Sequence, residues 1–432
     1  MKTNRDIAEY TLEALQKAGA DNAQCIVADG NVDELNADGG EFSLMRTLFN
    51  SSVSLKALKD GKKGTISVNK TDKETIDNAV KDCIATAESS VADSAESIAE
   101  LGKNEHFTVG IMEPDRDKLF DRLQEYLQDV KTEYPKVMME QLISSYTRGN
   151  QLLMNTNGVV YSYDYGGYDI SAMFSAHDGE KSSSFVGYGG DIKSPDHKLI
   201  DFGMMRTLLA ESERQIDTKP VNGKFVGKLI ITPACLDSIL MIIFRNFISD
   251  TTLIDGTSLW KDKLGKQVAS DKLSVSTVPL DEHVVCGERF TTEGYRSENM
   301  DIISDGVLKS FILSQYGAKK TGFSRAKNLS YNLSVRPGSA PHEDIIKSID
   351  RGILLNRFSG GRPGTNGDFS GVAKNSFLIE NGKVTGAISE TMMSGNLAEM
   401  LNNVIAVSAD TVCDGVSILP WIAFDGITIS GK

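Results

Sequence analysis

The chain has 432 residues, 40% apolar residues and a formal net charge of −13, so it is long enough for two or three domains with a large core. Such an acidic chain lacks the clustered Lys and Arg of a duplex-binding surface, which excludes direct nucleic-acid binding. Five scattered cysteines without a CxxC pair argue against disulfides and for reduced thiols in the cytoplasm. The charged N-terminus predicts no signal peptide, and no apolar run reaches the ~18 residues of a membrane span.

The N-terminal region predicts a helix followed by antiparallel strands. Residues 4–18 place apolar side chains on one side and are followed by Gly19, which is typical of an amphipathic helix and its end. A short strand is predicted over residues 24–28. Residues 42–68 alternate polar and apolar side chains and are interrupted at Asp60-Gly61, which indicates a meander.

A second helix is predicted after a capping box at residues 71–74, and its apolar stripe includes Cys83. Core packing is the favoured interpretation of this thiol, because free cysteines are commonly buried. The Ser-, Ala- and Glu-rich residues 89–104 indicate a surface connection. These elements make the first predicted domain, an α+β domain of residues 1–110.

The middle region, residues 111–222, predicts a helix and a β-meander, either as a domain of its own or packed with the first domain as one. The helix begins at Pro114-Asp115 and is expected to turn five apolar side chains inward: Leu119, Phe120, Leu123, Leu127 and Val130. Strands are predicted from Val137 to Tyr188, broken at Arg148-Gly149-Asn150, Asn157-Gly158 and Asp178-Gly179.

Four tyrosines in this meander could stack on nucleic-acid bases or form one face of a sheet. They have no basic neighbours, so the sheet interpretation is favoured for Tyr161, Tyr163, Tyr165 and Tyr168. Residues 196–217 predict a helix. It leads to Pro220-Val221-Asn222-Gly223, which is the predicted boundary of the C-terminal domain, residues 223–432.

The C-terminal domain opens with a predicted strand over residues 228–231. Thr232 is expected to cap the next helix, with Pro233 at its first position. This helix is apolar on nearly all sides through Phe247, as in a buried helix. Further strands are predicted over residues 273–278, 284–290, 300–303, 307–313, 404–407, 418–424 and 427–429, and residues 345–354 predict a helix that runs into a strand.

Short links between these strands favour antiparallel pairing. The predicted fold class is therefore α+β. It combines an N-terminal α/β domain of mixed helices and a β-meander with a C-terminal β-rich domain, which has largely antiparallel sheets and a buried helix.

A glycine-rich stretch, Arg357–Asn396, distinguishes the C-terminal domain. Its eight glycines permit positive φ or the close approach of another chain. The pair Asn381-Gly382 between two strand-like runs is a strong hairpin signal. The run Gly367–Gly371 is expected to end a loop before the first of these strands. A crowded turn and a ligand-facing loop both remain open as interpretations.

Three blocks of the sequence resemble the TldD/PmbA family, whose members are also labelled modulators of DNA gyrase. The first is LKDGKKG at residues 58–64, and the second runs from Ser304 to Gly338. The third contains a T-x-G-D-F-S motif, an I-E-N-G-K hairpin and a later G-N, which supply the candidate cleft or motif residues Thr365, Gly367, Asp368, Phe369, Ser370, Asn381, Gly382, Gly395 and Asn396. The acidic composition gives the gyrase label no support as direct DNA binding.

The resemblance implies that the active branch of the family carries a zinc motif, H-E-x-x-x-H, on the helix after the boundary. Counting back from Gly256 puts Met241 and Asn246 at the histidine positions and Ile242 at the glutamate position. Zinc needs histidine, cysteine or carboxylate ligands, and isoleucine cannot act as a base. The chain therefore resembles the metal-less PmbA/TldE branch, and it is expected to have no catalytic residue, metal site or cofactor of its own.

Two other candidate centres are weak. His283 and Cys286 are near each other in sequence, but in the predicted strand they point to opposite faces and do not form a nucleophile–base pair. Cys413 lies in a region where the zinc branch offers a cysteine ligand, but it is interpreted as a buried or loop thiol. No phosphate loop and no GxSxG elbow occurs.

Three functions remain open at this stage. The favoured one, implied by the resemblance, is a non-catalytic subunit of a cytoplasmic TldD/TldE-type metallopeptidase that acts on peptides or unfolded chains. Its partner would be a homologous zinc-bearing subunit or, in isolation, a second copy of the chain. The alternatives are a stand-alone hydrolase with an unrecognised site and a peptide-binding or regulatory module without peptidase activity.

Overall fold

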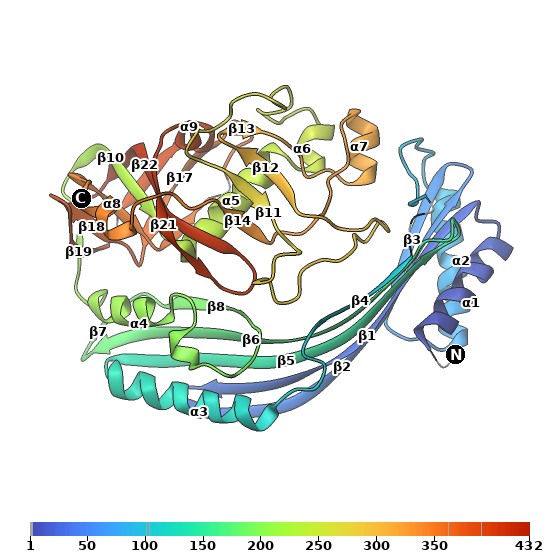
Figure 1. Ribbon diagram of the computed structural model, residues 1–432, viewed down its shortest axis with the longest axis horizontal. Helices are drawn as coiled ribbons and strands as arrows, with labels where there is room; N and C mark the ends of the chain where they lie inside the picture. Colours follow the sequence, from blue (N-terminus) through green and yellow to red (C-terminus); the bar gives the residue numbers. More distant parts are fainter. Residues whose placement is uncertain (1–2, 101, 103, 362, 390) are drawn as a thin grey trace.

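The computed structural model describes every residue except 1–2, 101, 103, 362 and 390. Within the described residues the strands form two sheets, one of eight strands and one of fourteen, each accompanied by helices (Figure 1). The fold class is therefore α+β, as the sequence predicts. The first sheet is long and curved and lies below the C-terminal part in the view of Figure 1.

The first sheet has the strand order β3-β2-β1-β5-β6-β4, with β7 and β8 paired to β6. Its strands are β1 (Asn22–Asp38), β2 (Glu41–Lys59), β3 (Lys62–Val68), β4 (Glu105–Gly110), β5 (Val137–Asn155), β6 (Val160–Asp178), β7 (Lys181–Ser182) and β8 (Val186–Ile192). The accompanying helices are α1 (Asn4–Lys17), α2 (Lys73–Ser89), α3 (Arg116–Glu133), the 3-10 turn η1 (Leu199–Asp201) and α4 (Met205–Arg214). Strands from residues 1–110 and from residues 111–222 thus share one sheet.

Two apolar clusters hold the helices to this sheet. One lies under α1 and α2 and contains Cys25 and Cys83, both fully buried as expected for Cys83. The other lies under α3 and α4, where the Tyr126 hydroxyl reaches Met205. Each helix buries one stripe of side chains, and this apolar burial stabilises the sheet.

The second sheet has the main order β13-β12-β11-β14-β22-β10-β15-β18-β19-β9. Its strands are β9 (Thr218–Pro220), β10 (Lys224–Ile231), β11 (Val275–Thr277), β12 (Met300–Ser304), β13 (Val307–Leu308), β14 (Leu333–Val335), β15 (Arg351–Leu355), β16 (Arg357–Gly360), β17 (Asp368–Lys374), β18 (Phe377–Glu380), β19 (Lys383–Ser389), β20 (Met392–Asn396), β21 (Val404–Cys413) and β22 (Ile418–Ser430). Its helices are α5 (Pro233–Phe247), α6 (Asp250–Ile254), α7 (Gln315–Thr321), α8 (His342–Lys347) and α9 (Leu397–Asn402).

Helix α5 is the centre of the largest apolar cluster, which includes Phe244 and Phe247. Its burial is incomplete, because one stripe that includes Ser238 and Arg245 is exposed. Thr232 stands at the N-cap position, but its hydroxyl donates to the Leu355 carbonyl rather than capping the helix. The prediction of a buried helix is therefore right for its core side and wrong for this stripe.

Two predicted strand ends are wrong, because the strands continue past the residues that suggested a turn or a strand end. The strand expected over residues 24–28 is the 17-residue β1, because β2 and β5 pair with it on both sides. Arg148-Gly149-Asn150 is not a turn but lies inside β5. A Cβ on Gly149 would stand 2.4 Å from the Tyr165 ring, so this glycine permits close packing instead of a turn.

Five further predictions need correction: three strands, the common face of four tyrosines, and the inward position of one helix residue. Residues 284–290 form no continuous strand and lie as irregular chain against the first sheet. The strands at 273–278 and 307–313 are reduced to β11 and β13, and apolar residues that flank them pack in the α5 cluster. Tyr168 faces the α3 cluster, whereas Tyr161, Tyr163 and Tyr165 face the opposite side, since odd and even positions of a strand alternate. Phe120, expected inward, is 37% exposed.

The N-terminal cap of α2 also differs from the expected one. Asp72, and not Thr71, is the N-cap, and its carboxylate accepts the Thr75 amide. The helix itself begins and ends near the predicted positions, since its apolar stripe fixes which side is buried.

The two parts of the molecule contact each other through an irregular segment of the C-terminal part. The Tyr163 hydroxyl donates to the Gly287 carbonyl at 3.3 Å, and the Gln24 amide donates to the Thr292 carbonyl at 2.9 Å. A further contact joins β8 to the residue after β21, where the Asp191 backbone amide donates to the Asp414 carbonyl at 2.8 Å. In the view of Figure 1 the curved first sheet lies below α5 and the rest of the C-terminal part.

Candidate functional site

The glycine-rich loop packs against helix α5, as its glycine density suggests. Gly367 has φ +86°, and a Cβ built on it would stand 3.1 Å from the Phe247 ring of α5. Phe369, the aromatic residue of the T-x-G-D-F-S motif, is buried in an apolar pocket with Ile239 and Ile242 of α5. Glycine has no Cβ, so it can adopt this positive φ while its backbone lies against the Phe247 ring. A larger residue at position 367 would push the loop away from α5.

The motif residues of the loop lie next to the later G-N pair. Strand β17 pairs with β20 so that Asp368 stands opposite Asn396 and Phe369 opposite Gly395. Asp368 to Gly371 are thus part of β17 and do not end the loop as predicted. Thr365 lies in an exposed turn, and the Ser370 side chain is also exposed.

The Asn381-Gly382 hairpin belongs to another region. Both residues have positive φ, 50° and 74°, and they connect β18 to β19 as predicted. Their amides donate to the carbonyls of Asp350 and Ile349, at 2.7 and 2.8 Å. The hairpin therefore rests on the connection between α8 and β15, and these contacts do not bring it to α5.

The α5 positions aligned with the zinc motif do not fit a metal. Met241 and Ile242 are half-buried and pack on the α5 cluster. The side-chain nitrogen of Asn246 is buried without a hydrogen-bond partner. A thioether, an alkyl group and an amide nitrogen are not the ligands that zinc prefers. In the described part of the chain, no group of three or more His, Cys, Asp or Glu residues could hold a metal ion.

An acidic junction between the two sheets is a feature that sequence reasoning missed. Asp237 of α5 accepts a hydrogen bond from the Ser417 hydroxyl at 3.1 Å. Burial is the main cause that raises the pKa of Asp237, and the nearby Asp414 carboxylate raises it further. Burial, followed by Asp169 and Asp414, raises the pKa of Asp191 to about 6. These carboxylates come from different elements, so no spacing in the sequence indicates their proximity.

The thiols near this junction are poor nucleophiles. Burial raises the pKa of Cys286 to about 11 and also raises that of Cys413, so both stay protonated near neutral pH. His283 and Cys286 lie in the irregular segment and not in a strand, and the His283 imidazole pairs with Asp281. The His283 carbonyl is 3.7 Å from the Cys413 sulfur, a contact that gives no nucleophile–base arrangement.

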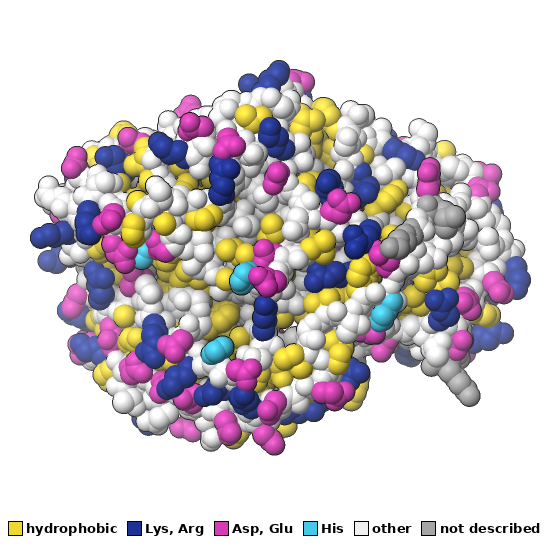
Figure 2. Space-filling view, in the orientation of Figure 1, with side chains coloured by type: hydrophobic (Ala, Val, Ile, Leu, Met, Phe, Trp, Pro, Cys, Tyr) yellow, Lys and Arg dark blue, Asp and Glu magenta, His cyan; other side chains and the backbone are white. Residues whose placement is uncertain are grey.

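The face of the molecule in Figure 2 has mixed charge. Figure 2 shows Lys and Arg side chains interspersed with Asp and Glu over the visible face, with hydrophobic side chains between them. This distribution lacks the single-sign patch of a nucleic-acid interface. None of the helices in the described segments is both long and apolar enough to cross a bilayer.

Comparison with known proteins identifies the family. The profile described as the PmbA/TldA metallopeptidase C-terminal domain matches residues 223–431. Residues 223–431 therefore belong to the TldD/PmbA family as its C-terminal domain. The matched segment contains α5, the glycine-rich loop, Asp237 and Asp414, whereas Asp191 of the acidic junction lies outside it.

Individual proteins are similar to this chain over different lengths. A protein of Methanocaldococcus jannaschii is 23% identical over 411 residues, which cover 92% of this chain and 93% of that protein. The metalloprotease PmbA of Escherichia coli O157:H7 is 31% identical over 152 residues, and a PmbA homologue of Haemophilus influenzae is 29% identical over 195 residues. The chain spans only 34% and 43% of the length of these two proteins.

Solved structures share the fold over the whole chain. TldE from Thermococcus kodakarensis has a TM-score of 0.84 and 18% identity, with 98% of this chain and 99% of that chain covered. A candidate modulator of DNA gyrase from Bacteroides thetaiotaomicron has a TM-score of 0.84 and 22% identity, with both chains covered completely. At these identities the likeness establishes the fold and no more.

Proposed function

We propose that this chain is a PmbA/TldE-like subunit of a cytoplasmic TldD/TldE-type metallopeptidase and does not itself cleave peptide bonds. The proposal rests on one observation about helix α5. Met241, Ile242 and Asn246 stand at the positions where the resemblance implies two zinc ligands and a base. Membership of a metallopeptidase-related family supports the reaction class. The protonated thiols near the junction offer no replacement nucleophile.

In this proposal a homologous zinc-bearing subunit supplies the metal and the base. This chain supplies part of the wall of the shared cleft. The exposed side of α5, which includes Ser238 and Arg245, forms that part of the wall. The substrates are peptides or unfolded chains, because an extended chain can add to a strand edge through backbone hydrogen bonds that tolerate many sequences.

The experiment combines the purified chain with a zinc-bearing homologue from the same cell and follows an unstructured peptide by mass spectrometry. Cleavage is expected from the mixture, and a chelator should abolish it. Cleavage by this chain alone that survives a chelator would overturn the proposal. Full activity of the zinc subunit without this chain would remove its proposed role.

A variant of α5 tests the cleft directly. Ser238→Trp adds bulk on the exposed stripe and should lower the activity of the mixture without unfolding the chain. Val91→Trp is the matched control, because Val91 is 88% exposed and lies in the connection that follows α2. Equal activity of the two variants would argue against α5 as a cleft wall.

A further inference from the structure

Two asparagines stand opposite each other where the second sheet meets helix α4. One antiparallel register runs through the pair β15–β18 and continues through the pair β16–β17. It places Asn356, between β15 and β16, opposite Asn375, between β17 and β18. Side chains at directly opposite positions of antiparallel strands are near neighbours. Both side chains are nearly fully buried, with exposed fractions of 7% and 6%.

The side-chain nitrogens of these asparagines have partners, but their oxygens do not. Asn356 Nδ2 donates to the Glu211 carboxylate of α4. Asn375 Nδ2 donates to the Ser184 carbonyl at 3.3 Å. These bonds fix the orientation of both amides, and each Oδ1 is left buried without a hydrogen-bond partner among the described residues. Because native proteins pair most of their buried polar atoms, two unpaired oxygens at one place indicate a missing group.

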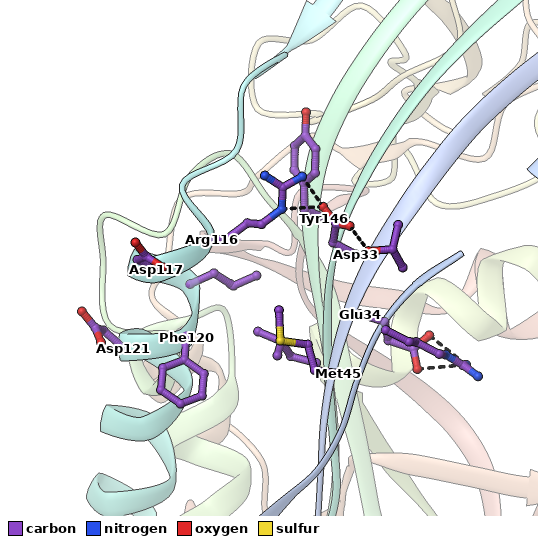
Figure 3. Close-up of a pocket in the computed structure, with 12 residues that line it drawn as sticks. Asp33, Glu34, Met45, Arg116, Asp117, Phe120, Asp121 and Tyr146 are labelled. Atoms are coloured by element: carbon purple, nitrogen blue, oxygen red, sulfur yellow. Dashed lines mark hydrogen bonds and ion pairs between the residues drawn. The ribbon is translucent and has the colours of Figure 1, made fainter. Parts of the chain in front are cut away.

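Glu211 adds a carboxylate without a counter-charge in contact. Its carboxylate accepts the Asn356 amide and has no ion pair within the described part of the chain. Burial raises the pKa of Glu211 to about 7, although the hydrogen bond and the nearby Arg214 lower it. The pocket between β2 and α3 shows the opposite case, because Asp33 there pairs with Arg116 at 2.6 Å (Figure 3). An ionised Glu211 would therefore be stabilised by a cation.

We propose that Glu211, Asn356 and Asn375 bind a monovalent cation, K⁺ or Na⁺, at this junction. Hard cations take carboxylate and amide carbonyl oxygens as ligands, and carbonyl oxygens can replace the hydration shell of K⁺. The three side chains offer one negative charge and two neutral oxygens, which matches a single positive charge. A divalent ion would leave a buried net charge close to Arg214, which is costly.

A buried water is the alternative occupant. One water can donate to both Oδ1 atoms, as buried waters do in many proteins. A water is neutral, however, and leaves the charge of an ionised Glu211 uncompensated. A cation satisfies the two oxygens and the carboxylate together, so the combination of these groups favours the ion.

The bound ion would connect the two parts of the molecule. Glu211 belongs to α4, which packs on the first sheet, whereas Asn356 and Asn375 belong to the second sheet. A neighbouring hydrogen bond crosses the same boundary, from the Gln215 side chain of the first part to the Ser376 carbonyl at 2.8 Å. The ion would thus add to the contacts that hold α4 against the second sheet.

Thermal unfolding of the full chain at about pH 8, where Glu211 is ionised, tests the site. Potassium, sodium and choline chloride are compared at equal concentration, because the choline cation is too large for it. The midpoint should be at least about 2 °C higher in K⁺ or Na⁺ than in choline, and the gain should saturate. Glu211→Gln should remove the difference, and Glu180→Gln, in an exposed turn, should keep it. Equal wild-type midpoints in all three salts, or a difference that survives Glu211→Gln, would overturn the proposal.

Anomalous scattering identifies the occupant directly. Thallium(I) is a heavy analogue of K⁺, so crystals of the full chain are grown in choline salts and soaked in thallium(I) nitrate. One anomalous peak is expected between the Glu211 carboxylate and the Oδ1 atoms of Asn356 and Asn375. Crystals of Glu211→Gln soaked in the same way should lack it. Ordinary water density without an anomalous signal at this place, or thallium bound only elsewhere, would show that the junction holds no cation.

Discussion

The side-chain amide of Asn396 donates a hydrogen bond to the Asp368 carboxylate at 2.9 Å. The same amide also donates to the Asn366 carbonyl at 2.8 Å, while its oxygen accepts the Ala398 amide at 3.0 Å. One side chain therefore joins the glycine-rich loop to the start of α9. The T-x-G-D-F-S motif and the later G-N pair thus have a structural link, and a ligand is not needed to explain why they occur together.

Asn396→Ala should destabilise the protein by about 2 kcal/mol, because it removes an N-cap and two bonds to the loop. Urea denaturation followed by circular dichroism measures the change. Asn402→Ala is the matched control, since the Asn402 amide makes a single bond to the Ala398 carbonyl on the exposed side of α9. An equal loss in both variants would show that Asn396 does not hold the loop.

Gly367→Val should cost roughly 2 kcal/mol or more, because a β-branched residue tolerates positive φ poorly and its Cβ would press on Phe247. Gly361→Val is the control in the same loop, because a Cβ there meets nothing within 4 Å and its φ is not positive. The midpoint of thermal unfolding compares the two. A Gly367 variant as stable as the Gly361 variant would contradict the close packing of loop and helix.

Glu211→Gln should change how stability depends on pH. Burial raises the pKa of the Glu211 carboxyl from 4.5 to about 7, despite its bond from the Asn356 amide. A raised carboxyl pKa means that the folded state binds the proton more tightly than the unfolded state does. The free energy of unfolding that this proton contributes is therefore full below about pH 4.5 and is lost as the pH rises through 7.

Glutamine mimics the protonated carboxyl, so the variant should match the wild type below pH 4.5 and exceed it by about 3 kcal/mol well above pH 7. Urea unfolding across this pH range provides the measurement. Glu180→Gln, in an exposed turn, should leave the profile unchanged. A variant whose advantage is constant with pH would show that Glu211 does not titrate in this range.

The purified chain should retain no stoichiometric zinc after dialysis, because Met241 and Ile242 cannot act as its ligands. Elemental analysis measures this directly. The control is a zinc-bearing homologue purified in the same way. About one tightly held zinc per chain would refute the prediction and reopen a catalytic role for this chain.

Local signals in the sequence were sufficient where structure depends on neighbours along the chain. The Asn381-Gly382 hairpin forms because both residues adopt the positive φ that a tight turn needs. The turn at Asp60-Gly61 follows the same rule, with φ of 52° and 71°. Helix α2 forms where its apolar stripe predicts, because that stripe is buried on one side.

The same signals misled where distant residues decide the outcome. Gly149 is typical of a turn, yet it lies within β5 because β1 and β6 pair with it on both sides, and the Tyr165 ring occupies the space of a side chain there. Residues 284–290 alternate like a strand, yet no neighbouring strand pairs with them continuously, and they rest on the first sheet. Strand formation requires a partner, which the segment itself does not specify.

The sequence by itself determined the fold class and the resemblance to the TldD/PmbA family, because these depend on residue types, on periodicity and on motifs read in order. Only the tertiary structure decided which motifs meet. It joined Asp368 to Asn396, separated both from the Asn381-Gly382 hairpin, and gathered Asp191, Asp237 and Asp414 at one junction. These relations depend on strand pairing across long stretches of chain, where the physical contact and not the spacing along the sequence sets the distance.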